Sequence, residues 1–396
     1  MLLLNIDLLK NCFMKILIVS KCPTHPTNAG NRRWTLSQCE ILEQLGHVVH
    51  FLYIAEFPLE KARLPLFKND LDETSLFWRD RFHLYKLSKF SHLRNILVTY
   101  RREWFNKGFY HCDDKYPKGL TSFVRKLQQK ENFDVCILNY YELSKIAEKI
   151  SFPKVAINTH DCFSYKNLVI NKKYAGQLTA SEEAKAMQRC RSIFALQEEE
   201  AIFFQKLSPK SIVYTLFSYT EYRPSEVVNN YNILFLSGSN QFNINGLNWF
   251  VNDVFPLIQK EFPQAELLVG GAICSVVSYS NKHIKLLGSI NNASEFYSMG
   301  DVAINPVYQG TGIKVKTIES IAYDKVTIAH PHSKIGIFKS ETAPLFVSEE
   351  PIEWLNFLKT IWRDKSAIER IKVKNKDYLF KMNNYIVQNY KLFLEQ

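Results

Sequence analysis

The sequence lacks the features of several common protein classes. None of its eight cysteines forms a C-x-x-C pair, so zinc ribbons and thioredoxin-type redox sites are not expected. No apolar run reaches about 18 residues, the length that a membrane-spanning helix requires. The N-terminus has no basic segment before its apolar residues and no small-residue cleavage site after them, so no signal peptide is expected. We therefore expect a cytoplasmic protein with reduced thiols.

The chain has the size and composition of a two-domain globular protein. Its 396 residues suit two domains of roughly 150–200 residues each. The formal charge of +11 points to nucleic acid, an anionic membrane or a phosphorylated small molecule as partner. No zinc finger, helix-turn-helix or RNA-binding motif is present, so nucleic acid is not an expected partner.

A basic and aromatic stretch spans residues 76–110. Lysines and arginines among tryptophan, phenylalanine and tyrosine suit an anionic membrane interface, where each cation adds roughly 1 kcal/mol of attraction. A helical pair with solvated basic faces and a buried aromatic stripe would give the same composition. Both interpretations fit the sequence, so an anionic membrane surface is one expected partner.

Two segments each predict a strand, a loop, a helix and a second strand. The first joins apolar runs at 15–20 and 48–55 through a helix at 34–45, and the second begins at 232–239. That second unit continues through a polar loop and a helix at 246–262 into the run 266–271. Further buried parallel strands are predicted at 135–138, 155–158, 284–287, 302–305 and 325–329.

The predicted fold class is α/β, with two Rossmann-like doubly wound domains that face each other across a cleft. The N-terminal domain is placed at 14–206, and a turn-rich linker at 207–230. The C-terminal domain follows at 231–375, and a helix at 376–396 returns to the N-terminal domain. Because open α/β sheets bind ligands beyond the carboxyl ends of their strands, the chemistry is expected in the cleft.

The stretch 301–336 carries the most informative pattern. A strand ends at Asn305-Pro306, a glycine-containing loop follows, and a helix then begins that carries Lys314, Lys316 and Glu319. Glycines and a helix N-terminus let backbone N–H groups approach a phosphate, and the lysines add positive charge. An acidic residue on the helix can accept the hydroxyls of a ribose.

This segment resembles the donor-binding region of glycosyltransferase family 4. The stretches 235–250 and 286–290 are similar to that family's C-terminal domain, and 15–34 with 45–49 is similar to its first βαβ unit. The stretch 158–167 resembles the segment that holds the family's cleft histidine. The resemblance covers roughly residues 14–60 and 155–340. It implies the GT-B architecture, with an acceptor-binding N-terminal domain and a nucleotide-sugar-binding C-terminal domain.

By that resemblance, His160 faces the donor sugar and its diphosphate, and Glu319 faces the ribose; these two are the expected catalytic residues. The residues expected to bind the donor are Gly30, Arg32, Ser239, Asn240, Ile290, Gly310, Thr311, Gly312, Ile313, Lys314, Lys316 and Glu319. The sequence departs from the family in three places. The loop 239–245 lacks the usual arginine and lysine, Thr311 replaces the first of two glutamates, and Tyr323-Asp324 replaces a small residue and glycine.

The resemblance implies a retaining glycosyltransferase that moves a sugar from a nucleotide diphosphate, UDP being favoured. The expected acceptor is a glycan or lipid-linked molecule in bacterial surface polysaccharide assembly, at the inner face of the cell membrane. The nucleotide sugar is a co-substrate, and neither a cofactor nor a metal is expected, because Asp70-Leu-Asp72 follows no strand and reads as a solvated loop. Two alternatives remain: a non-catalytic glycan- or membrane-binding protein, and a sugar-nucleotide epimerase of the same fold.

Overall fold

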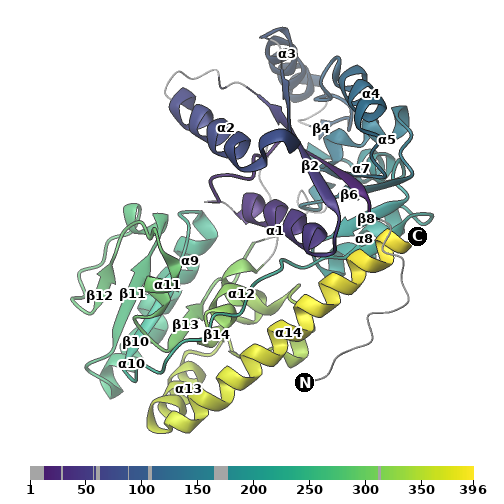
Figure 1. Cartoon of the computed structure of the whole chain (residues 1–396). Coiled ribbons are helices and arrows are strands. Elements are labelled where there is room, and N and C mark those ends of the chain that lie inside the picture. The colour runs from purple at the N-terminus through teal and green to yellow at the C-terminus, as the bar shows by residue number, and fades with distance from the viewer. Residues whose placement is uncertain are drawn as a thin grey trace, which may run out of the picture. The chain divides into compact units, whose positions relative to one another are not determined.

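The computed structural model describes residues 13–27, 30–56, 58, 63–87, 89–105, 109–164, 177–310 and 314–396. The chain divides into two compact units; Figure 1 colours it by residue number, from purple at the N-terminus to yellow at the C-terminus. The first unit holds the residues up to Leu216 together with Asn389–Gln396, and the second holds Phe217–Gln388. Each unit is built on one large parallel sheet with helices, so the predicted α/β class with two doubly wound sheets is confirmed.

The first sheet has seven strands in the order β3-β2-β1-β5-β6-β8-β9, and every described pairing is parallel. The strands are β1 (Lys15–Ser20), β2 (Val48–Ala55), β3 (Phe82–Lys86), β5 (Val135–Asn139), β6 (Lys154–Asn158), β8 (Ser192–Ala195) and β9 (Ile212–Thr215). A separate parallel pair joins β4 (Phe109–Tyr110) to β7 (Gln177–Leu178). The central strands are apolar and fully buried, which is why their sequence predicts them so well.

Helices of the first unit connect these strands. They are α1 (Gly30–Gln44), α2 (Leu64–Trp78), α3 (Lys89–Phe105), α4 (Leu120–Glu131), α5 (Lys145–Lys149), α7 (Ala180–Met187) and α8 (Glu198–Leu207). The expectation of a solvated loop around Asp70 is wrong, because Asp70 lies inside α2. Pro65 in the first turn of α2 favours helix initiation, and the Asp70 carboxylate binds Arg32 within the unit.

The second sheet has six strands in the order β12-β11-β10-β13-β14-β15, again with parallel pairings. The strands are β10 (Asn232–Leu236), β11 (Glu266–Gly270), β12 (Ile284–Leu286), β13 (Val302–Asn305), β14 (Val326–Ala329) and β15 (Leu345–Val347). The helices are α9 (Gln241–Trp249), α10 (Phe255–Glu261), α11 (Ala293–Tyr297), α12 (Val315–Ala322), α13 (Pro351–Arg363) and α14 (Lys365–Glu395).

The helix after β10 begins earlier than the sequence predicts. The stretch 240–245 reads as a polar loop, but α9 starts at Gln241. The Asn240 side chain accepts a hydrogen bond from the backbone N–H of Asn243 and so caps the helix. A π-helical turn at Phe250–Val254 then joins α9 to α10.

The long helix α14 contributes its last residues to the first unit, as the yellow ribbon of Figure 1 shows at its C-terminal end. There Phe393 packs edge-on against Phe194 of β8, with ring centroids 4.9 Å apart. The Gln38 side-chain amide donates a hydrogen bond of 3.0 Å to the hydroxyl of Tyr390. Burial of these rings fixes the end of the helix on the first sheet.

Candidate functional site

The carboxyl edge of the second sheet gathers the predicted donor-binding residues of that unit. Ser239 and Asn240 follow β10, Ile290 follows β12, and Gly310 follows β13. Because these strands and β11 are neighbours in one parallel sheet, their carboxyl ends open at the same edge. The predicted ligands Thr311, Gly312 and Ile313 lie outside the described residues.

Glycines let the loops at this edge pack tightly. Gly310 has a φ of +122°, and a Cβ there would lie 3.3 Å from the ring of Phe242. A Cβ on Gly246 of α9 would lie 2.9 Å from the carbonyl oxygen of Pro306. The helix that follows β10 is therefore in direct contact with the loop that follows β13, and glycine makes this contact possible.

Lys316 ties these two loops together. Its ammonium group donates a hydrogen bond of 2.7 Å to the side-chain oxygen of Asn243, whose amide in turn donates one of 2.9 Å to the Gly238 carbonyl. The pKa of Lys316 is lowered to about 8. Burial is the largest cause, the nearby Lys314 acts in the same direction, and Glu319 opposes the shift. A bound anion would stabilise this ammonium group in its charged form.

Lys314 stands directly before α12, next to His332. Its ammonium lies 3.2 Å from Nε2 of His332, and the same nitrogen lies 2.9 Å from the Gly310 carbonyl oxygen. Burial lowers the pKa of His332, with Lys314 as the second cause, so the imidazole is neutral at pH 7. His332 thus lies between the Lys314 ammonium and the Gly310 carbonyl, and it positions the glycine loop beside the start of α12.

Glu319 lies on α12, one turn after Lys316, and its side chain is partly buried. Ser239 is exposed, while Ile290 packs against Gly270 at the end of β11, where an added Cβ would lie 2.7 Å from its Cγ1. The second unit thus brings polar groups, two lysines and a carboxylate to one edge of one sheet. This set can bind an anion together with a polyol.

In the first unit, His160 follows β6 and packs between aromatic side chains. Its φ is +58°, its ring stacks on Tyr140 at 4.0 Å, and Trp34 of α1 meets it edge-on at 5.0 Å. Nε2 lies 2.6 Å from the side-chain oxygen of Asn139. Burial lowers the pKa of His160 to about 3, so the imidazole is neutral and acts through hydrogen bonds at pH 7.

The loop after His160 is held by a buried carboxylate that the sequence did not reveal. Glu183 of α7 accepts hydrogen bonds from the backbone N–H groups of Phe163 (2.8 Å) and Ser164 (2.9 Å). Burial raises the pKa of Glu183, and these hydrogen bonds oppose the rise. Glu183, Asn139, Tyr140 and Trp34 were missed because their role depends on tertiary contacts; the asparagine at the end of β5 was the one local signal.

Gly30 and Arg32 lie at the start of α1. A Cβ on Gly30 would meet nothing within 4 Å, so this glycine leaves open space beside the helix start. The Arg32 guanidinium forms a two-pronged ion pair with Asp70, at 2.8 and 2.7 Å, and donates to the His25 carbonyl. Its charge is therefore balanced within the first unit, where it fixes the loop after β1 to α2.

Two features are absent from the described part of the chain. Within it, no group of three or more histidine, cysteine or acidic side chains is placed to hold a metal ion. Within it too, no helix has both the length and the apolar character to cross a membrane.

The chain is similar to several known proteins in sequence or in fold. Residues 230–364 match the family described as glycosyl transferases group 1. An uncharacterized 44.6 kDa protein in the cps region of Klebsiella pneumoniae is 20% identical over 421 residues, covering 95% of this chain and 96% of that protein. Sucrose-phosphate synthase from Thermosynechococcus elongatus superposes with a TM-score of 0.64 at 13% identity, covering 96% of this chain and 98% of that one. The pneumococcal O-GlcNAc transferase GtfA, in complex with UDP and GlcNAc, superposes with a TM-score of 0.62 at 11% identity, covering 97% and 99%.

Proposed function

We propose that this chain, a member of the glycosyl transferases group 1 with the GT-B fold, moves a sugar from a UDP-linked donor to a glycan or lipid-linked acceptor. The proposed process is the assembly of a bacterial surface polysaccharide, such as lipopolysaccharide, capsule or O-antigen. Two findings on relatives support it: a similar protein lies in a cps region, and GtfA was crystallised with UDP.

The observation that carries the proposal is the pair of lysines at the start of α12. Lys314 and Lys316 lie at the carboxyl edge of the sheet, where a helix N-terminus adds unpaired N–H groups and a positive dipole end. Because Lys316 is held by Asn243, its charge is fixed in place before the donor binds. These groups supply the cationic charge that is missing from the loop 239–245.

The proposed chemistry is electrostatic. The two lysines stabilise the charge that develops on the diphosphate as the glycosidic bond breaks, so no metal or cofactor is required. The acceptor hydroxyl attacks from the face that the diphosphate leaves, which retains the anomeric configuration. Glu319 accepts the ribose hydroxyls, and the neutral imidazole of His160 makes a hydrogen bond to the donor sugar.

Titration calorimetry with UDP tests the nucleotide site. Glu319→Ala is expected to weaken UDP binding about 10- to 100-fold, because a carboxylate that accepts two hydroxyls contributes roughly 1.5–3 kcal/mol. Glu353→Ala, which removes a carboxylate on α13 of the same unit, is the matched control and should leave the affinity unchanged. A wild-type protein that binds no nucleotide, or equal affinities in both variants, would contradict the proposed donor site.

We also propose that the first unit docks on an anionic membrane through α3. Leu93, Leu97, Tyr100 and Trp104 follow the spacing of one helical face, and each is more than half exposed, with Trp104 at 85%. One interpretation of the sequence required a buried aromatic stripe, but this stripe on α3 is exposed. Arg101 beside it is exposed as well and adds a cation for acidic headgroups.

Arg94 and Arg102 of α3 form contacts within the first unit. Arg102 forms a two-pronged ion pair with Asp114, at 2.7 and 2.8 Å, and Arg94 donates to the carbonyl oxygen of Tyr116. Both side chains therefore fasten α3 to the loop that follows β4. A helix anchored in this way presents its apolar stripe as a fixed surface, which suits insertion among lipid headgroups.

Sedimentation with lipid vesicles tests the docking surface. Wild-type protein is expected to bind vesicles that contain phosphatidylglycerol at low salt, and to bind pure phosphatidylcholine more weakly. The double change Leu97→Ser and Trp104→Ser should reduce binding at least about tenfold, since two large apolar side chains no longer leave water. Phe380→Ser on α14, which is 65% exposed, is the control. Equal sedimentation of both variants would refute docking through α3.

A further inference from the structure

A polar pocket lies on the first unit, at the carboxyl edge of its sheet. Its volume is about 520 Å³, within the range of small-molecule sites. Lys21 follows β1, Glu56 follows β2, and Lys115 comes from the loop after β4. The remaining lining residues, Asn95, Ile96, Thr99, Tyr100 and Glu103, all belong to α3.

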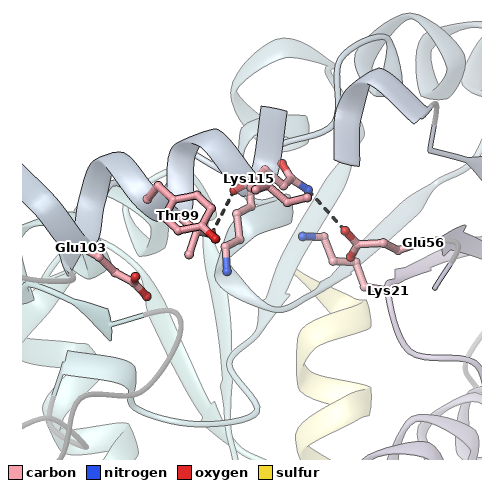
Figure 2. Close-up of a pocket in the computed structure, with 8 residues that line it drawn as sticks. Lys21, Glu56, Thr99, Glu103 and Lys115 are labelled. Atoms are coloured by element: carbon pink, nitrogen blue, oxygen red, sulfur yellow. Dashed lines mark hydrogen bonds between the residues drawn. The ribbon is translucent and has the colours of Figure 1, made fainter. Parts of the chain in front are cut away.

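Helix α3 turns a mainly polar face to this pocket. Asn95, Thr99 and Glu103 are four residues apart and share one side of the helix, roughly a third of a turn away from the apolar stripe. Tyr100 of that stripe lies between the two faces and also lines the pocket. Figure 2 shows Glu103 toward one end of the pocket and Glu56 toward the other, with the amines of Lys21 and Lys115 between them in this view. Asn95 donates to Glu56 (3.3 Å), so that carboxylate is held in position.

The two lysines are the feature that selects a ligand. Lys115 lies over the ring of Tyr110, 4.5 Å from its centre, and no ion pair to it is found among the described residues. Burial lowers the pKa of Lys115, Glu142 opposes the shift, and the charge of Lys21 lowers it further. Among the described residues, Lys21 forms one long ion pair, of 3.7 Å, with Glu142. An anion between these amines would relieve their repulsion.

The rest of the pocket suits a sugar. The carboxylates of Glu56 and Glu103 and the amide of Asn95 can bond to hydroxyl groups, and the exposed ring of Tyr100 offers an apolar face. We infer that this pocket is the acceptor site and that the acceptor is an anionic saccharide, with its phosphate or carboxylate held by Lys115 and Lys21. This inference rests on the proposed glycosyl transfer, and it adds the chemical class of the acceptor.

Ligand titrations followed by NMR, with UDP present throughout, test the inference on the full chain. The probes are glucose 1-phosphate, glucuronic acid and methyl glucoside. At least one anionic probe is expected to bind tenfold or more tightly than methyl glucoside. A preference for glucose 1-phosphate indicates a phosphate beside the sugar, as in a lipid-linked acceptor, and a preference for glucuronic acid indicates an acidic sugar of a glycan.

Three variants locate the binding. Lys115→Gln should remove most of the preference for anionic probes, whereas Lys126→Gln, at an exposed lysine on α4, should not. Glu103→Gln removes a negative charge from the pocket and should strengthen anion binding two- to fivefold, a gain that misfolding cannot produce. Equal binding of all three probes, or anion binding insensitive to Lys115 and Glu103, would overturn the inference.

The same samples separate this inference from the donor site. Lys115→Gln should leave the affinity for UDP within twofold of the wild type, because Lys115 belongs to the first unit and the predicted nucleotide-binding glutamate to the second. If the wild type binds no UDP but shows the Lys115-dependent preference, the donor proposal fails while the anion site stands. If UDP binds and the preference is absent, the inference fails alone.

Discussion

Replacing Lys316 with glutamine is expected to lower the affinity for a UDP-sugar by roughly 30- to 100-fold, the effect of losing a hydrogen bond to charged phosphate worth about 2–3 kcal/mol. Asn243 holds the ammonium at 2.7 Å, so the charge is preorganised and its loss is not offset by another flexible side chain. Lys282→Gln, at an exposed lysine of the same unit, is the matched control. Calorimetric titration of the three proteins measures the effect, and a change below threefold would contradict the assignment of Lys316.

The same lysine predicts how donor binding depends on pH. Its pKa of about 8 in the free protein means that it is charged below pH 8 and loses its proton above it. Bound diphosphate favours the charged form, so affinity should fall by about twofold from pH 7 to 8 and by up to about fivefold more toward pH 9. Lys316→Arg keeps the charge and should abolish this fall. His332, whose pKa is below its usual value, is neutral throughout this window and Lys314 and Glu319 are the other charges nearby.

The second large effect concerns the turn after β11. Gly271 has a φ of +97°, and a Cβ there would lie 2.3 Å from the carbonyl oxygen of Ser237. Gly271→Ala should therefore destabilise the protein by about 3 kcal/mol or more, through backbone strain and a clash with a neighbouring main chain. Thermal unfolding followed by circular dichroism should show a midpoint lowered by roughly 10 °C.

Gly288 supplies the control for this prediction. Its φ is +74°, but a Cβ there would meet nothing within 4 Å. Gly288→Ala thus carries the backbone strain without the clash, and we expect a loss of about 1 kcal/mol. If both variants unfold at the same temperature, close packing of the loops after β10 and β11 is not the reason for glycine at 271.

The sheets could be predicted from the sequence because their central strands are buried on both faces. Runs such as Ile16–Val19 and Val135–Leu138 are continuously apolar, and the strands there match the prediction within one residue. The strands β3, β8, β9 and β15 were not predicted. The strands β3, β9 and β15 lie at sheet edges and are only partly buried, and β8 is a buried run of only four residues. The resemblance to glycosyltransferase family 4 and the GT-B fold are confirmed.

The proposed donor-binding residues of the second unit lie close together in the sequence. Lys316 and Glu319 lie in α12 and Lys314 stands directly before it, so their spacing alone predicts their common position. Arg32 shows the opposite case: its partner Asp70 lies on another helix, and only the fold shows that its charge is already balanced. The pocket lined by α3 could not be predicted from the sequence for the same reason. Its lining residues come from α3, from the positions directly after β1 and β2, and from the loop after β4.

Glycosyl transfer itself is tested by incubating UDP-linked sugars with the protein and a bacterial lipid extract, with and without EDTA, and identifying the products by mass spectrometry. We expect release of UDP from one donor, a sugar-extended lipid product, and no effect of EDTA. Binding of the donor without any turnover would contradict transfer and favour a non-catalytic protein. Conversion of the donor into an isomeric nucleotide sugar would contradict it equally and identify an epimerase.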